Sequence, residues 1–232
     1  MPKLTKRQKK LEGIVDKSKV YELKGASALV KKTASTKFDE TVDLSIHLGV
    51  NPKELTQGVR GTVPLPHGTG KKVRVCVFCK SEKAKEAQAA GAEFVGSEEL
   101  IEKVKGGWCE FDVAIATPDM MRLIGALGRV LGPRGLMPNP KAGTVTLDVT
   151  KAINEVKAGR IEFKMDKQGN INVPIAKASF SEEAIYENAT TLLEALMQAK
   201  PSGAKGHFIK SISMSTSMGP GIRTNYTIAK KA

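Results

Sequence analysis

A row of small hydroxyl side chains near the end of the sequence is the first feature that could do chemistry. From Ser211 to Gly219 every second residue is serine or glycine, and the residues between them are larger. Alternation with a period of two indicates a β-strand with two different faces. One face can pack on a core, while the other offers donors and acceptors and lets another backbone come close. A solvated strand face without a ligand is the alternative interpretation.

A second group of side chains stands at the start of another alternating segment. Lys37, Phe38 and Thr41 place a cation, an aromatic ring and a hydroxyl within five residues. Such a group can contact phosphate and stack on a base. The alternative is that Phe38 is an ordinary core residue.

A third group lies in a loop rich in glycine and proline, residues 128–143. It carries Arg129, Arg134 and Lys141 among turn-forming residues. We interpret these three side chains as a secondary RNA contact, and a purely structural crossover loop is the alternative.

The charge of the chain favours a polyanionic partner. Lys and Arg number 37 and Asp and Glu 24, which gives a net charge of +13 at pH 7. Residues 68–159 hold 14 of the basic and 11 of the acidic residues, so +10 of the net charge lies on the two flanks. Nucleic acid is the first candidate partner, and the flanks are its expected landing site.

No spacing in the sequence predicts catalytic residues, a metal site or a cofactor. Cys76 and Cys79 form a C-x-x-C pair on an expected strand, where residues three apart face opposite sides. We therefore expect buried, inert thiols. The run from Gly68 to Lys71 lacks the first glycine and the hydroxyl of a phosphate-binding loop. We expect no small-molecule substrate.

Neither a signal peptide nor a membrane span is expected from the sequence. Residues 1–13 are charged, and no apolar run approaches the ~20 residues that cross a bilayer. Three cysteines do not form a disulfide framework. These features predict a cytoplasmic protein with reduced thiols.

The order of expected elements predicts an α/β protein with a discontinuous α+β domain and an inserted Rossmann-like α/β domain. Residues 68–159 alternate strands and helices, which is typical of a parallel sheet with crossover helices. Each flank has too few strands to bury its own helix. We therefore expect residues 1–67 and 160–232 to form one domain with a mainly antiparallel four-stranded sheet. Residues 160–165 and 171–176 are expected to pair as a hairpin within it. Two connections would form a two-stranded hinge.

Four long motifs then point to a known family. They are KFDETVDL (37–44), VRGTVPLPHGTGK (59–71), LGPRGLMPNPKAGTV (131–145) and SMGPGIR (217–223). On these residues the chain resembles the large-subunit ribosomal protein L-one family, the side-stalk proteins of bacterial ribosomes. The family usually has Thr-Met-Gly where this chain has Ser217-Met218-Gly219, so the hydroxyl is kept and a methyl group is lost.

The resemblance implies a structural constituent of the large ribosomal subunit, without enzymatic activity or cofactor. Its expected partners are large-subunit rRNA, where it forms a mobile stalk near the exit site, deacylated exit-site tRNA, whose release it assists, and its own operon mRNA, whose translation it represses. By motif, the implied rRNA-binding residues are Lys37, Phe38 and Thr41 on one strand and Ser211, Ser217, Met218 and Gly219 on the other. The alternative function is a nucleotide-binding enzyme that uses the inserted α/β domain.

Overall fold

The computed structural model describes residues 5–16, 18–50, 58–201 and 206–225. The chain divides into two compact units, one of residues 1–70 and 161–232 and one of residues 71–160. The second unit is thus a continuous segment within a discontinuous first unit. Both contain strands and helices, so the fold is mixed α/β, as the sequence indicates.

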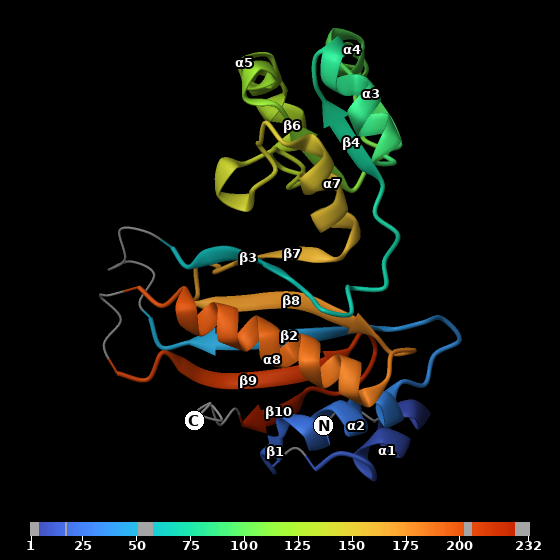
Figure 1. Cartoon of the computed structure of the whole chain (residues 1–232). Coiled ribbons are helices and arrows are strands. Elements are labelled where there is room, and N and C mark those ends of the chain that lie inside the picture. The colour runs from blue at the N-terminus through green and yellow to red at the C-terminus, as the bar shows by residue number, and fades with distance from the viewer. Residues whose placement is uncertain (1–4, 17, 51–57, 202–205, 226–232) are drawn as a thin grey trace. The chain divides into compact units, whose positions relative to one another are not determined.

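A five-stranded sheet forms the centre of the discontinuous unit (Figure 1). Its strands, in spatial order, are β1 (Tyr21–Glu22), β10 (Ile222–Asn225), β9 (Ile209–Thr216), β2 (Thr41–Leu48) and β8 (Asn170–Lys177). All neighbours are antiparallel except β1 and β10. Strands β2 and β9, which come from the two flanks of the sequence, therefore pair directly within the sheet. The sheet has five strands where the sequence predicted four, and its membership also differs: the short strands β1 and β10 were not anticipated, and the strands expected at residues 59–65 and 160–165 lie outside it.

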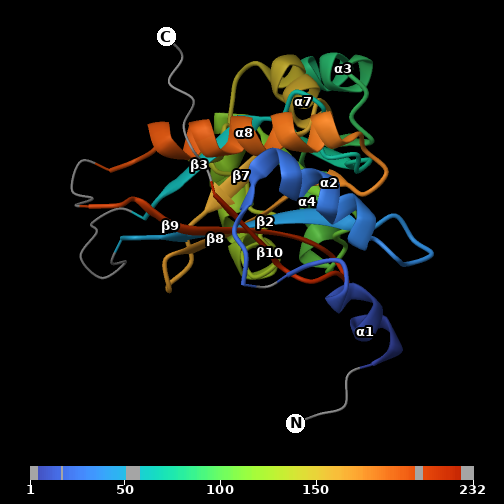
Figure 2. The ribbon, with the colours of Figure 1, turned by 90° about the horizontal axis from the view of Figure 1, so that it is seen from below.

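Two helices cover one face of this sheet. α2 (Leu23–Thr33) and α8 (Glu182–Gln198) lie on the same side of the strands (Figure 2). Their apolar stripes pack with every second residue of β2 and β9 in a single core. The Ser181 hydroxyl caps α8 by accepting a hydrogen bond from the Ala184 amide at 3.2 Å. A further helix, α1 (Lys6–Glu12), contains most of the basic N-terminal residues; Lys3 lies outside the described residues.

The other face of the sheet is polar. Residues of β2 alternate between half-buried and buried along the whole strand. The register places rows of half-buried or exposed polar side chains across three strands, for example Asn172, Ser45 and Ser213. The period of two thus separates a helix-covered core face from an open polar face, as the sequence predicted.

One predicted pairing is wrong. Strand β7 (Arg160–Lys164) was expected to form a hairpin with β8, but it pairs with β3 (Arg60–Pro64) in a separate two-stranded sheet. The tight turn itself is present, since the Asp166 carboxylate accepts hydrogen bonds from backbone amides within residues 168–170. In the β3–β7 sheet Gly61 leaves room for the ring of Phe163, which a Cβ would approach to 2.6 Å.

The segment that leaves this unit after β3 is held by α8. The buried Asn188 side chain accepts a hydrogen bond from the His67 amide at 3.2 Å. Its NH₂ group donates to the carbonyls of Gly68 at 2.9 Å and Ile175 at 2.8 Å. His67 also pairs through its ring with Glu187 at 2.5 Å. One fully satisfied amide therefore joins three separate segments of the chain.

The continuous unit is built on a three-stranded parallel sheet. Its strands, in spatial order, are β5 (Phe94–Gly96), β4 (Val75–Phe78) and β6 (Val113–Ala116). Separate apolar clusters lie on its two faces, one with α4 (Glu98–Lys105) and the other with α3 (Ser81–Ala89) and α7 (Val149–Lys157). Helices on both faces of a parallel sheet are typical of a Rossmann-like unit. Between β6 and α7 the chain forms short helical turns: η1 (Pro118–Met120), α5 (Met121–Ile124), η2 (Gly125–Leu127), α6 (Gly128–Leu131) and η3 (Pro140–Ala142).

A carboxylate ties the start of this unit to β6. Asp112 accepts hydrogen bonds from the Lys71 ammonium at 2.8 Å and from the Arg74 amide at 3.1 Å. The bond from Lys71 is the main reason that the pKa of Asp112 falls to about 2, against the effect of its burial. The ionised carboxylate is thus part of the folded state.

Candidate nucleic-acid interface

The start of β2 and the end of β9 are joined by a reciprocal pair of hydrogen bonds. The Thr41 amide donates to the Ser217 hydroxyl at 3.0 Å, and the Ser217 amide donates to the Thr41 carbonyl at 3.0 Å. The Thr41 hydroxyl accepts a bond from the Lys177 ammonium at 2.8 Å. Ser217 is exposed, so its hydroxyl both fixes the neighbouring strand and faces solvent.

Two large apolar side chains are exposed beside this junction. Phe38 is 57% exposed and Met218 56% exposed, although both are of types that proteins usually bury. Lys37 is exposed next to Phe38, and no ion pair of its side chain occurs among the described residues. An open ring, an open thioether and a free ammonium group suit contact with bases, sugars and phosphates.

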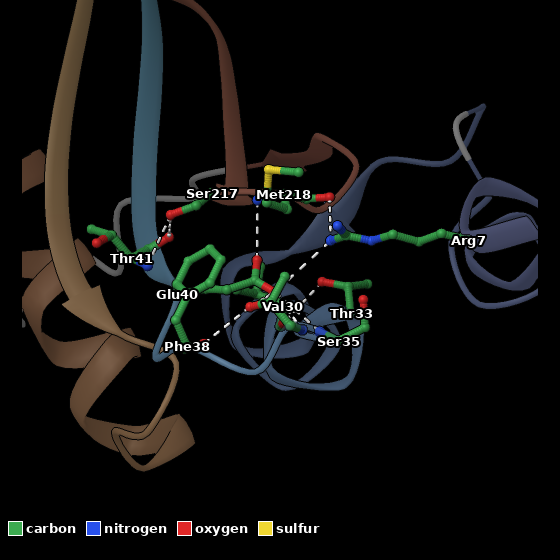
Figure 3. Close-up of polar contacts among 10 residues, drawn as sticks. Arg7, Val30, Thr33, Ser35, Phe38, Glu40, Thr41, Ser217 and Met218 are labelled. Atoms are coloured by element: carbon green, nitrogen blue, oxygen red, sulfur yellow. Dashed lines mark hydrogen bonds and ion pairs between the residues drawn. The ribbon is translucent and has the colours of Figure 1, made fainter. Parts of the chain in front are cut away.

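Beneath these side chains lies a buried carboxylate, Glu40, which is 1% exposed (Figure 3). One of its oxygens accepts bonds from the amides of Ser35 and Thr36 at 3.0 and 3.1 Å and from the Thr36 hydroxyl at 2.9 Å. The other accepts from the Met218 amide at 3.1 Å. The Thr216 hydroxyl is buried close by and makes no well-formed hydrogen bond to a described residue.

These donors determine the ionisation of Glu40. Burial by itself would raise the pKa of this carboxyl group. The polar contacts from Thr216, Met218, Thr36 and Ser35 outweigh burial and lower the pKa to about 2 from its ordinary value of 4.5. Glu40 is therefore a carboxylate at neutral pH, and its charge belongs to the folded structure.

The backbone of Met218 is also bonded through its carbonyl group, by Arg7. The Arg7 guanidinium donates to the Met218 carbonyl at 2.6 Å and lies 3.9 Å from the Glu40 carboxylate. Both backbone polar groups of Met218 are thus bonded within the protein (Figure 3). Only its side chain is left for a ligand.

Gly219 follows at a point with no room for a side chain. A Cβ here would lie 2.3 Å from the Thr216 hydroxyl oxygen and 3.3 Å from that of Thr33. The Gly219 amide donates to the Thr216 carbonyl at 3.1 Å, which closes the turn after β9. The glycine is therefore required by the close approach of two hydroxyls.

Ser211 belongs to the same polar face but lies apart from the other predicted residues. It pairs in register with His47, at the far end of β2 from Thr41. Six residues of extended chain separate it from Ser217, which is roughly 20 Å. The structure thus brings together Lys37, Phe38, Thr41, Ser217, Met218 and Gly219, and it leaves Ser211 at the opposite end of the sheet face.

That face carries an acidic group closer to Thr41 than to Ser211. Asp43 lies opposite Ser215 on β9, between the two ends. Burial raises the pKa of this carboxyl group, and the charge of Lys177 opposes the rise. Lys177, which also donates to the Thr41 hydroxyl, is therefore the cation that this acidic group faces.

The predicted secondary contact lies in the continuous unit. Arg129, in α6, and Arg134, after it, are both exposed, and no ion pair of either occurs among the described residues. Lys141 lies in η3, and its side chain is outside the described part of the chain. No Asp or Glu occurs between Asp119 and Asp148, so this loop region is uniformly basic.

Three residues of the site were missed by sequence reasoning. Glu40 could have been found, because it has the same parity as the buried positions of β2 and is therefore an acidic residue on the core side. Lys177 depends on the pairing of β8 with β2, which the expected hairpin obscured. Arg7 gave no signal, since nothing in its neighbours connects it to a residue 211 positions away.

The structure also bears on the cysteines, on metal binding and on membrane spans. Cys76 and Cys79 are buried in the clusters on opposite faces of the parallel sheet, as expected from residues three apart on a strand. Burial raises the pKa of Cys76 to about 12 and also raises that of Cys79. Among the described residues, no group of three or more His, Cys, Asp or Glu side chains could hold a metal ion. None of the described helices is long and apolar enough to span a bilayer.

Exposed apolar side chains and lysines on a tightly bonded backbone are typical of a nucleic-acid-binding protein. The family model described as Ribosomal protein L1p/L10e family matches residues 30–220. The chain belongs to this family, and it is therefore a structural protein of the large ribosomal subunit that binds rRNA. It is not an enzyme, which sets aside the alternative of a nucleotide-binding enzyme.

Proposed function

We propose that the end of the polar sheet face formed by residues 37–41 and 217–219 binds a folded region of large-subunit rRNA. Phe38 and Met218 would cover sugar and base surfaces, Lys37 and Lys177 would neutralise phosphates, and the hydroxyls would reach the 2′-hydroxyl groups. The exposure of Phe38 and Met218 beside a rigid, hydrogen-bonded backbone carries this proposal. The discontinuous unit of residues 1–70 and 161–232 would be the RNA-binding domain.

The experiment measures affinity for an rRNA fragment that contains the stalk-base stem-loop. Phe38→Ala should weaken binding about 5- to 150-fold, as expected for the loss of a base-stacking side chain at about 1–3 kcal/mol. Tyr186→Ala is the matched control, because Tyr186 is an exposed aromatic residue of α8, on the covered side of the sheet. Equal affinity of the wild type, Phe38→Ala and Met218→Ala would contradict the proposal.

Ser217 gives a finer test of the same surface. Ser217→Ala removes the acceptor of the Thr41 amide and an exposed hydroxyl, so affinity should fall about tenfold, the equivalent of ~1.4 kcal/mol. Ser217→Thr keeps the hydroxyl and adds the methyl group of the usual family residue, and it should bind at least as well as the wild type. A weaker Ser217→Thr would show that the position is crowded and that the assigned hydroxyl contact is wrong.

Ser211 is the distant member of the proposed surface. Its place in the same serine row supports a contact with the far part of a long RNA segment, about 20 Å along the face. Ser211→Ala should therefore weaken binding of the full stem-loop and leave binding of a fragment shortened at that end unchanged. An equal effect on both RNAs would remove Ser211 from the contact set.

We further propose that this protein forms the mobile stalk beside the exit site and assists release of deacylated tRNA, with the two connections between the units as the hinge. The exposed arginines 129 and 134, in a region without acidic residues, support a secondary RNA contact there, together with Lys141. Ribosomes that carry Arg129→Ala/Arg134→Ala should release exit-site tRNA with altered kinetics while the protein stays bound. Unchanged kinetics would limit the function to the rRNA contact.

The same surface would also bind the chain's own operon mRNA and repress its translation in the cytoplasm. One surface for two RNAs predicts strict competition. The rRNA fragment should displace the leader mRNA, and Phe38→Ala should weaken both in proportion. Simultaneous binding of both RNAs would contradict a shared site.

A further inference from the structure

We propose that Glu40 and Arg7 are the positioning residues of the RNA site, which hold the Phe38 and Met218 segments in one fixed geometry and do not themselves contact RNA. This inference rests on the proposed function of that surface. It concerns two side chains of which one is buried and the other comes from α1, outside the residues that match the family.

Glu40 connects the two RNA-facing segments through a single carboxylate. Oxygen Oε1 stabilises the turn that precedes β2, because it accepts hydrogen bonds from the amides of Ser35 and Thr36 and from the Thr36 hydroxyl. The Thr36 hydroxyl also lies 3.0 Å from the Phe38 carbonyl, so its single proton is shared between that carbonyl and Glu40. Oxygen Oε2 takes the Met218 amide on the other strand. The segment before Phe38 and the backbone of Met218 are thus hydrogen-bonded to the same carboxylate.

Arg7 binds the carbonyl group of Met218, whose amide is already bonded to Glu40. The Met218 N–H, in the peptide plane shared with Ser217, donates to Glu40, and the Met218 C=O, in the plane shared with Gly219, accepts from Arg7, so neither plane can rotate without breaking a charge-assisted bond. The Arg7 Nε is buried and has no acceptor among the described residues, so the guanidinium forms no second bond from that atom. Its contacts face Met218 and Glu40 (Figure 3).

A site held in this way binds more tightly because fewer conformations are lost on binding. Removing the bonds that Glu40 and Arg7 make to the Met218 backbone should therefore weaken RNA binding without changing the number of phosphates neutralised. This distinguishes positioning from contact. An arginine that touches a phosphate contributes about 0.7–0.9 to the slope of log K against log salt, and a positioning arginine contributes nothing.

The experiment measures affinity of the full chain for the rRNA stem-loop at several salt concentrations. Arg7→Ala should weaken binding at least fivefold with an unchanged salt slope. Lys10→Ala is the matched control, since it removes one positive charge from an exposed position of the same helix. Glu40→Gln keeps the size of the side chain and should also weaken binding, with its folding checked by circular dichroism.

A double-mutant cycle connects the effect to Met218. If Arg7 acts by placing Met218, then Arg7→Ala should change affinity less than twofold when Met218 is already alanine. A full effect in that background, with a slope reduced by about 0.7–0.9, would show a direct phosphate contact and overturn the proposal. Wild-type affinity of Arg7→Ala would overturn it as well. Loss of binding in Phe38→Ala alongside either result would leave the proposed RNA surface intact, whereas wild-type binding by Phe38→Ala would contradict that surface itself.

Discussion

Replacement of Asn188 by alanine should destabilise the discontinuous unit by about 3 kcal/mol. This side chain is fully buried and makes three hydrogen bonds, to the His67 amide and to the carbonyls of Gly68 and Ile175. Alanine would leave three backbone groups without these partners, and each lost buried partner costs about 1–3 kcal/mol. The lower end of that range applies because part of the segment after β3 can reach solvent.

The change is measured by urea unfolding of the full chain, followed by far-ultraviolet circular dichroism. Thr191→Ala is the control, because its exposed hydroxyl donates to a carbonyl of the same helix and its loss should cost less than 0.5 kcal/mol. Asn188→Asp keeps the acceptor but loses both donors, so it should be at least as damaging at neutral pH. A loss below 1 kcal/mol for Asn188→Ala, or an equal loss for Thr191→Ala, would refute the reasoning.

Three further outcomes are expected. The ionised Glu40 carboxylate, with a pKa of about 2, contributes to the free energy of unfolding above pH 4.5, and this contribution is lost as the pH falls toward 2. Glu40→Gln should lack this pH-dependent contribution, which amounts to up to about 3 kcal/mol. Acid unfolding curves of the two proteins measure the difference. A pH-independent difference between the two proteins would contradict this prediction. Asp112→Asn should lower the stability of the continuous unit by roughly 1 kcal/mol at pH 7, after allowance for solvent screening. The difference should vanish near pH 2, where Asp112 becomes protonated. The fluorescence of Trp108, the single tryptophan, reports unfolding of this unit. In the native protein an aromatic disulfide reagent at pH 8 should modify the partly accessible Cys109 and leave Cys76 unmodified, because its thiol has a pKa of about 12; rapid modification of two or more thiols would show that the core opens.

The architecture followed from periodicity where one face of an element is apolar. Alternation in residues 41–48 and 211–219 predicted two strands with a core face and a polar face, and both are present, as β2 at residues 41–48 and β9 at residues 209–216. Partner choice was the part that periodicity could not give. A suitable turn follows residues 160–164, and yet this strand pairs with β3, where Phe163 lies against Gly61; a contact between residues so far apart in sequence leaves no local pattern.

The candidate site divides in the same way. Phe38, Thr41 and Ser217 could be named from residue type and position, and their strands pair directly. The group beneath them, Glu40, shows in the sequence only as an acidic residue at a core-facing position. Arg7 reaches the site from a helix far away in sequence, and no local pattern encodes such an approach.

The continuous unit is inserted in the sequence of the discontinuous one, and this order has a consequence for folding during synthesis. Residues 71–160 are contiguous and hold all three strands of their own sheet, so this part can fold as soon as it has left the exit tunnel. The partner of Thr41, by contrast, is translated 176 positions later. If the proposed site at residues 37–41 and 217–219 is the one that binds RNA, a nascent polypeptide has no finished site until its last strands emerge, and an incomplete molecule cannot compete with a complete one for the RNA.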